Sequence, residues 1–186
     1  MAYIIVASAM VLVMVPGLGF LYSGLARRKS ALSLIWACMG SYAVVTFQWY
    51  FWGFSLAFSR TATNGFIGDL HHFGLRNTLA VPSEESPLMP ELLVSFYQMQ
   101  FAAVTVAIIM GAVAERGRVL PAMVFSFFWL TLVYCPIACW VWNPSGWAST
   151  GNLDENKQAK FGVLDYAGPF TLPPLRGYYP HPDADK

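Results

Sequence analysis

Charged residues are absent from four long stretches of this 186-residue chain, and no other feature constrains its fold as strongly. The stretches without Asp, Glu, Lys or Arg are 1–26, 30–59, 92–114 and 119–153. A bilayer core excludes charge over about 20 consecutive helical residues, and each stretch contains an apolar run of that length. Hydrophobic residues make up 56% of the sequence and charged residues 11%, whereas soluble domains carry about 25% charge. The sequence therefore predicts a membrane protein.

The fold class expected from this pattern is an all-α membrane protein with four transmembrane helices. Helix follows from burial in lipid, because backbone N–H and C=O groups must be satisfied within the spanning segment. The predicted spans are approximately 3–25, 32–58, 92–114 and 119–141.

The connections between these spans differ in length and charge. Residues 26–30 and 115–118 form short, basic connections. Residues 60–91 and 143–160 are longer, rich in Gly, Pro and Asn, and mixed in sign. Because short basic loops remain on the cytoplasmic side of a membrane, this pattern predicts an N-terminus outside.

Composition and motifs argue against several other classes. A net charge of +1 gives no case for nucleic acid as a partner, which requires clustered basic residues. The cysteines Cys38, Cys135 and Cys139 lie inside predicted spans, which does not suggest a disulfide framework. A cleaved signal peptide is disfavoured, because no basic segment precedes the first apolar run and the run continues past Pro16. No catalytic or phosphate-binding motif occurs, so neither an enzyme nor a cofactor is expected.

Aromatic residues are the first candidates for chemistry within the spans. Tyr97 and Phe101 are four residues apart, which places them on one helix face, and Thr105 continues that stripe. An aromatic face attracts a small cation where water is scarce, by roughly 0.5–2 kcal/mol. Trp142, at the outer end of the fourth span, is a second candidate. The alternatives are helix packing for the pair and an interfacial anchor for Trp142.

Ionisable residues supply one further candidate. Asp165 is the acid of a short apolar run at 161–168, and an acid entering a membrane segment marks a functional site or a polar network. The alternative is an ordinary loop residue. The histidines at 71, 72 and 181 lie in the long outer loop and the tail, and no cysteine or acidic cluster accompanies them, so no metal site is expected.

The end of the chain departs from the membrane pattern. Pro169, Pro173 and Pro174 stop any helix that begins at 161–168. The expected organisation is therefore a membrane domain over 1–168, followed by a proline-rich, disordered tail over 169–186.

Several motifs together resemble ammonium transporters of the Amt/Mep/Rh family, and the fungal Mep branch in particular. The first span carries the family's first-helix signature as PGLGFLYSGLARRKS at 16–30. The later motifs, in the family's order, are YQMQFA at 97–102, GAVAER at 111–116, WLTLVYCPIA at 129–138 and LDYAG at 164–168. The resemblance covers nearly all of 1–168, so the chain is interpreted as the N-terminal part of such a transporter.

The resemblance implies a substrate and a role for each candidate residue. The substrate is ammonium, which loses a proton so that ammonia crosses a narrow apolar pore. Phe101 matches the aromatic gate over that pore, with Tyr97 just outside it. Trp142 matches the tryptophan that holds ammonium at the outer recruitment site, and Asp165 matches the acid that shapes this site. A homotrimer in the plasma membrane is also implied.

The sequence departs from the family where the pore is completed. Family members have eleven spans, largely built as two inverted halves with the pore between them. Here Pro169 and Pro173 stand where the fifth helix should carry the first pore histidine. The chain is therefore expected to be inactive alone, as a fragment of a longer product or a truncated gene model. The alternative is a four-span protein with a structural or partner-regulating role, but not a tetraspanin or claudin, whose outer loops contain cysteines.

Overall fold

The structure, a computed structural model, describes residues 1–62, 64–79, 81–83, 88–112 and 118–149. Its helices are α1 Ala2–Leu25, α2 Ala31–Gln48, η1 Trp49–Gly53, α3 Phe54–Phe58, η2 Phe73–Leu75, α4 Glu91–Ala112, α5 Val119–Trp129, η3 Leu130–Tyr134 and α6 Cys135–Trp142. Several of these are continuous, so the described ranges contain four helices long and apolar enough to cross a membrane: Ala2–Leu25, Ala31–Phe58, Glu91–Ala112 and Val119–Trp142. The predicted all-α fold class is confirmed. The proposed tail lies outside the described residues.

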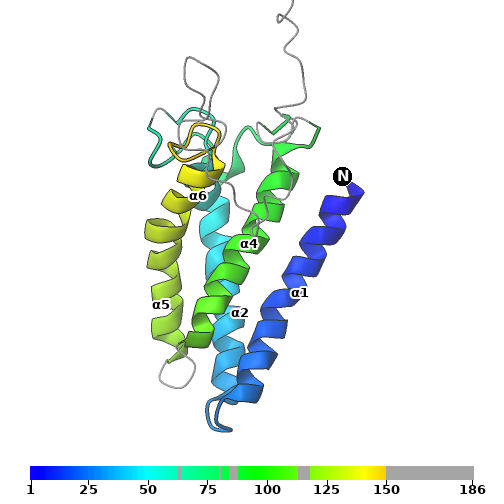
Figure 1. The fold of residues 1–186 in the computed structure, drawn as a ribbon, viewed down its shortest axis with the longest axis vertical. Coiled ribbons are helices and arrows are strands. Elements are labelled where there is room, and N and C mark those ends of the chain that lie inside the picture. The colour runs from blue at the N-terminus through cyan, green and yellow to red at the C-terminus, as the bar shows by residue number, and fades with distance from the viewer. Residues whose placement is uncertain (63, 80, 84–87, 113–117, 150–186) are drawn as a thin grey trace, which may run out of the picture.

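The four long helices lie side by side in an up-and-down bundle (Figure 1). Helix α2 contacts α1, α4 and α5, and α1 also packs against α4. The N-terminus lies at the end of the bundle that carries the 59–90 connection, and the turn between α1 and α2 lies at the opposite end (Figure 1). Successive long helices therefore run in opposite directions through the bundle.

Small side chains allow the helices to approach closely. Ala102, Ala103 and Ala107 of α4 are fully buried, as membrane helices generally pack through small residues. Gly111 lies against the ring of Tyr22 on α1, and a Cβ added there would overlap that ring unless the tyrosine side chain moved. The Tyr22 hydroxyl donates a hydrogen bond to the Ile108 carbonyl at 3.3 Å, which fixes that ring against α4.

Two π-helical turns, η1 and η3, interrupt the second and fourth spans at a point where these spans contact each other. Gln48 Nε2, just before η1, donates to the Phe127 carbonyl at 2.9 Å and to Thr131 Oγ1 at 2.8 Å. Trp52 Nε1 donates to the same hydroxyl at 3.2 Å. Single π turns occur often at functional sites, and the sequence pattern gave no sign of these two.

The 59–90 connection is held to the bundle by a buried ion pair. Glu91, the first residue of α4, is only 3% exposed. Its carboxylate accepts from Arg60 Nε at 3.0 Å and lies 2.9 Å from Arg60 Nη2, a two-pronged arrangement that favours arginine. The buried His72 ring approaches the same carboxylate at 3.8 Å and makes a 3.0 Å hydrogen bond to the Arg76 carbonyl.

Asp69 organises the exposed part of the same connection. The hydroxyls of Ser59 and Thr61 donate to its carboxylate, and the backbone N–H of His71 donates at 3.0 Å. Burial acts to raise the pKa of the Asp69 carboxyl, but these hydrogen bonds and the nearby His71 outweigh it and leave the pKa below its ordinary value. The ionised form is therefore the one that the fold favours.

We predict that Glu91→Gln lowers the free energy of unfolding by about 1–3 kcal/mol. Removing one partner of a fully buried pair costs about 3–5 kcal/mol, and the loss here is smaller because the Arg60 side chain keeps 21% exposure. Thermal unfolding in detergent, followed by circular dichroism, measures the change. Arg76→Gln, which removes an exposed charge from the same connection, serves as control. Equal unfolding temperatures for the two variants would contradict the prediction.

We also predict a pH-dependent contribution from Asp69. Because its folded pKa is lowered, its hydrogen bonds contribute stability above the unfolded pKa of about 3.9, and this contribution disappears as pH falls through the folded pKa. The difference in Tm between the native chain and Asp69→Asn should therefore be present at neutral pH and vanish in strong acid. A difference that grows as the pH falls would rule this assignment out.

Candidate functional site

The predicted gate residues form a half-buried aromatic pair on α4. The rings of Tyr97 and Phe101 lie edge to face, with centroids 4.9 Å apart and planes at 74°. Thr105 follows on the same face and donates to the Phe101 carbonyl at 2.8 Å. The opposite side of this stretch is buried, including Ala102 and Ala103. Tyr97, Phe101 and Thr105 thus form the half-buried face of a helix segment, 97–105, whose other residues are buried.

Trp142, the predicted recruitment residue, belongs to a second aromatic group. Its half-buried ring lies 6.1 Å from the Tyr134 ring at 74°. Tyr134 in turn lies 6.2 Å from Trp49 and 6.1 Å from Trp129. Trp142 and Phe101 both pack against the same buried core.

The position of Trp142 is set by the residue that follows it. Asn143 is 1% exposed and ends α6 in an extended conformation. Its side-chain amide donates to the carbonyls of Ala57 at 3.3 Å and Ser59 at 3.0 Å. These bonds tie the end of α6 to the end of α3. They hold Trp142 at the end of the bundle where the 59–90 connection lies.

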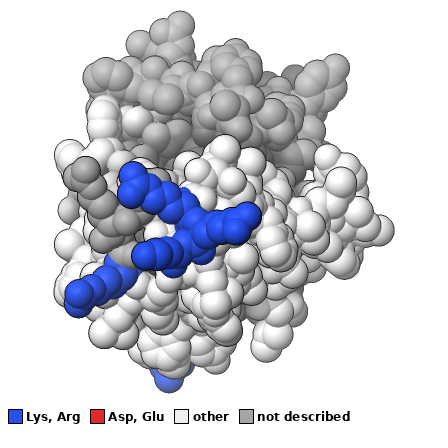
Figure 2. Space-filling view, turned by 90° about the horizontal axis from the view of Figure 1, so that it is seen from below, with Lys and Arg blue, Asp and Glu red and all other residues white. Residues whose placement is uncertain are grey.

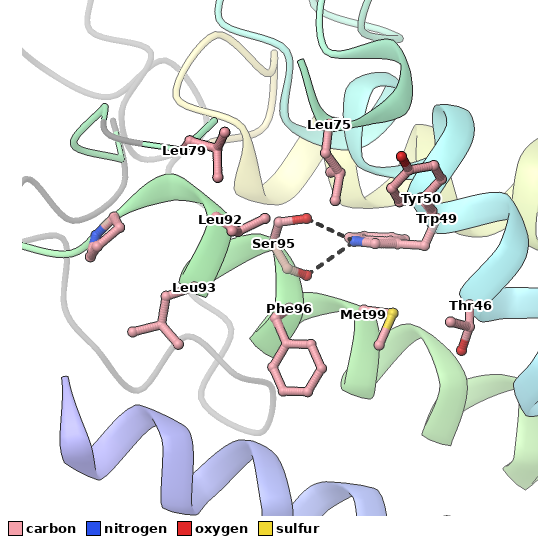
Figure 3. A pocket seen from close by; sticks show the side chains of 11 residues that line it. Thr46, Trp49, Tyr50, Leu75, Leu79, Leu92, Leu93, Ser95, Phe96 and Met99 are labelled. Carbon is pink, nitrogen blue, oxygen red and sulfur yellow. Dashed lines mark hydrogen bonds between the residues drawn. The ribbon is translucent and has the colours of Figure 1, made fainter. Parts of the chain in front are cut away.

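A large apolar cavity borders Trp49, a member of the second aromatic group (Figure 3). Its volume is about 670 Å³, and its lining comes from α2, η1, α4 and the 59–90 connection. Trp49 forms part of its wall and donates from Nε1 to the Ser95 carbonyl at 3.0 Å and to Ser95 Oγ at 3.3 Å (Figure 3). Neither the Tyr97–Phe101 pair nor Trp142 lines this cavity.

The acid Asp165 and the histidines are the remaining ionisable candidates. Asp165 lies outside the described residues, so its position relative to Trp142 stays a prediction. Within the described ranges, no group of three or more His, Cys, Asp or Glu side chains could hold a metal ion. The adjacent rings of His71 and His72, 4.7 Å apart, are therefore not accompanied by a third ligand in that part of the chain.

Sequence reasoning did not single out Tyr134, whose ring contacts Trp142, or Trp49, whose ring contacts Tyr134. Tyr134 lies within the WLTLVYCPIA motif. The motif marks this segment as characteristic of the family, but it does not indicate which side chains Tyr134 contacts. Two buried glutamines of α4 were also missed. Gln100 accepts a 3.3 Å hydrogen bond from the Tyr42 hydroxyl, and Gln98 is 3% exposed. Contacts between distant segments decide the environments of Tyr134, Trp49 and Gln100.

Comparison with known proteins identifies relatives along most of the chain. A sequence model described as the Ammonium Transporter Family matches residues 2–172. The chain is 57% identical over 169 residues to Ammonium transporter MEP2 of Saccharomyces cerevisiae, covering 90% of this chain and 32% of the relative. It is 53% identical to Ammonium transporter 2 of Schizosaccharomyces pombe, with 90% and 31% covered. The crystal structure of Saccharomyces cerevisiae Mep2 superposes with a TM-score of 0.77 at 56% identity, covering 90% of this chain and 36% of that one.

The long apolar helices and the structural match define a membrane protein built as a helical bundle. Within this class, the chain belongs to the ammonium transporter family, as its motifs indicated. It spans about a third of the length of the curated relatives it matches. Both relatives are named as transporters, in agreement with the expectation of a function other than catalysis.

We predict opposite outcomes for two substitutions at Tyr134. Its side chain is 7% exposed, and its hydroxyl has no hydrogen-bond partner among the described residues. Tyr134→Phe keeps the ring and removes an unsatisfied group, so the unfolding free energy should stay within about 0.5 kcal/mol or rise. Tyr134→Ala removes the ring and should cost about 3–5 kcal/mol. Thermal unfolding distinguishes them, and a large loss in the Phe variant would reveal a partner for the hydroxyl.

Proposed function

We propose that this chain serves transmembrane transport of ammonium, contributing part of the outer recruitment site and gate. The observation that carries the proposal is the half-buried Tyr97–Phe101 pair on a stripe of α4, where the sequence matches the ammonium transporter family. Aromatic faces are the feature that a small cation needs when it leaves water. The proposed substrate is ammonium on the outer side and ammonia in the pore.

In this proposal each aromatic residue has a distinct task. Trp142 offers its ring face to the cation, a contact of roughly 0.5–2 kcal/mol. Tyr134 and Asn143 hold that tryptophan through the contacts described above. Phe101 covers the entrance with Tyr97 outside it, and Asp165 supplies the negative charge that shapes the site. Loss of the cation's hydration favours the neutral form, because burial disfavours charge.

The proposed setting is the plasma membrane, with the N-terminus outside and a homotrimer as the working assembly. The orientation is supported by the distribution of charge, since the basic connection at 26–30 lies at the end of the bundle opposite the N-terminus (Figure 1). The trimer and the plasma membrane are proposed from the family resemblance.

We further propose that the 186-residue polypeptide by itself is inactive. Four spanning helices do not enclose a pore formed between two repeats of a transporter. Expressed alone in yeast cells that lack their own ammonium transporters, it should fail to restore growth on low ammonium, although it is detected in the membrane. Robust growth of those cells would overturn this part of the proposal and favour a complete pathway within these helices.

The roles of Trp142 and Phe101 are tested in a chimera. Residues 2–168, which end where the chain departs from the family pattern, replace the matching segment of the Saccharomyces cerevisiae relative, and uptake of labelled methylammonium is measured in the same cells. The chimera should transport, and Trp142→Leu should raise the apparent KM up to about thirtyfold, the equivalent of a lost cation–π contact. Phe101→Ala should also impair uptake.

Trp36→Leu is the matched control for the tryptophan, because Trp36 is 61% exposed and far from α6 in the sequence. It should leave the KM unchanged. Unaltered KM values in both the Trp142 and Phe101 variants would refute the assignment of a recruitment site to these rings.

A further inference from the structure

The end of the bundle opposite the N-terminus carries a concentrated positive charge. Arg27, Arg28 and Lys29 lie in the turn between α1 and α2, and Arg118 immediately precedes α5. All four side chains are exposed. Seen from this end, the Lys and Arg side chains gather on one face, and no Asp or Glu appears among the described residues in view (Figure 2). We call these four residues the basic face.

The local backbone holds part of this face in a defined position. Helix α1 ends at Leu25, and Ala26 adopts an extended conformation with φ −85° and ψ 165°. The chain then turns, and the Ser30 N–H donates to the Arg27 carbonyl at 2.8 Å. Arg28 and Lys29 therefore occupy the tip of a hydrogen-bonded turn, where both side chains are exposed. A tight turn loses less entropy on binding than a long, unconstrained loop would.

Exposed apolar side chains lie directly next to this charge. Leu25, Leu32, Trp36 and Leu120 are between 61% and 78% exposed. Leu25 ends α1, Leu32 and Trp36 lie near the start of α2, and Leu120 lies in the first turn of α5. A charged band bordered by an apolar band matches a molecule with an anionic head and an apolar tail. A free anion or a nucleic acid would use the charge but not its apolar border.

We propose that the basic face binds anionic phospholipid of the adjoining leaflet, with the headgroup phosphate on Arg28, Lys29 and Arg118 and the acyl chains along the apolar border. Arginine is suited to phosphate because its guanidinium can donate two parallel hydrogen bonds. Charge clusters of this size next to a spanning helix are typical of sites for acidic lipid. The site is independent of the aromatic groups at the other end of the bundle.

Electron spin resonance of spin-labelled lipids tests the proposal on the whole 186-residue chain. The chain is reconstituted in phosphatidylcholine vesicles that contain a trace of labelled phosphatidylserine or labelled phosphatidylcholine, and the relative association constant of the two probes is measured. We expect a preference for phosphatidylserine of about fivefold or more, since a single basic residue near the surface gives about this factor. In 1 M salt, where the Debye length is about 3 Å, the preference should fall.

The combined variant Arg28→Gln, Lys29→Gln and Arg118→Gln should bring the ratio close to one. Arg76→Gln, which removes an exposed cation from the opposite end, is the matched control and should retain the native ratio. The single variant Arg28→Gln is compared directly with Arg76→Gln. If the combined variant does not reconstitute, a lower ratio in Arg28→Gln than in Arg76→Gln supports the proposal. Equal helical content by circular dichroism shows that the variants are folded.

Several outcomes would overturn the proposal. The first is a ratio near one, for the native chain, between the association constants of labelled phosphatidylserine and labelled phosphatidylcholine. The second is a ratio that the Gln substitutions at the basic face leave unchanged. The third is an equal fall of the ratio in Arg28→Gln and Arg76→Gln. Displacement of labelled phosphatidylserine by inorganic phosphate at constant ionic strength would also overturn it, because the site would then bind a free anion. No step of the test involves ammonium, so its failure leaves the proposed function untouched.

Discussion

In a bilayer core the peptide backbone has no water to bond, so each N–H and C=O must find a partner within the protein. This requirement makes helices of the four charge-free stretches, and it extends to the polar side chains that the helices carry. Gln48 and Trp49 donate to groups on neighbouring spans, and Asn143 donates to the carbonyls at the end of α3. The same hydrogen bonds that satisfy buried groups therefore fix how the spans meet.

The position of the candidate site depends on these cross-links. The π turns η1 and η3 lie beside the Gln48–Thr131 contact, and each inserts an extra residue into its span. One residue rotates the following helix face by about 100°. Tyr134, the last residue of η3, and Trp142, which follows on α6, receive their orientation after that rotation. A regular helix through the same sequence would direct Trp142 to a different side of the bundle.

The two ends of the bundle carry different chemistry. At one end, the buried Arg60–Glu91 pair anchors the 59–90 connection. The aromatic groups of α4 and α6 lie toward the same end. At the other, short turns expose cations beside apolar side chains, with no such pairing described for Arg28 and Lys29. We propose the first arrangement as the place where a small cation leaves water, and the second as a surface for anionic lipid.

Hydropathy and charge alone determined the class of protein, the number of long helices and the basic character of one end, because lipid burial acts on each segment separately. Local spacing also determined that Tyr97 and Phe101 share a face, since four residues make about one helical turn. Motif order led to the ammonium transporter family. Only the tertiary structure decided that the Tyr134 ring contacts both Trp142 and Trp49, that Glu91 is paired with Arg60, and that two spans contain π turns. These features arise from contacts between residues far apart in the chain, and no local pattern records which side chains will meet.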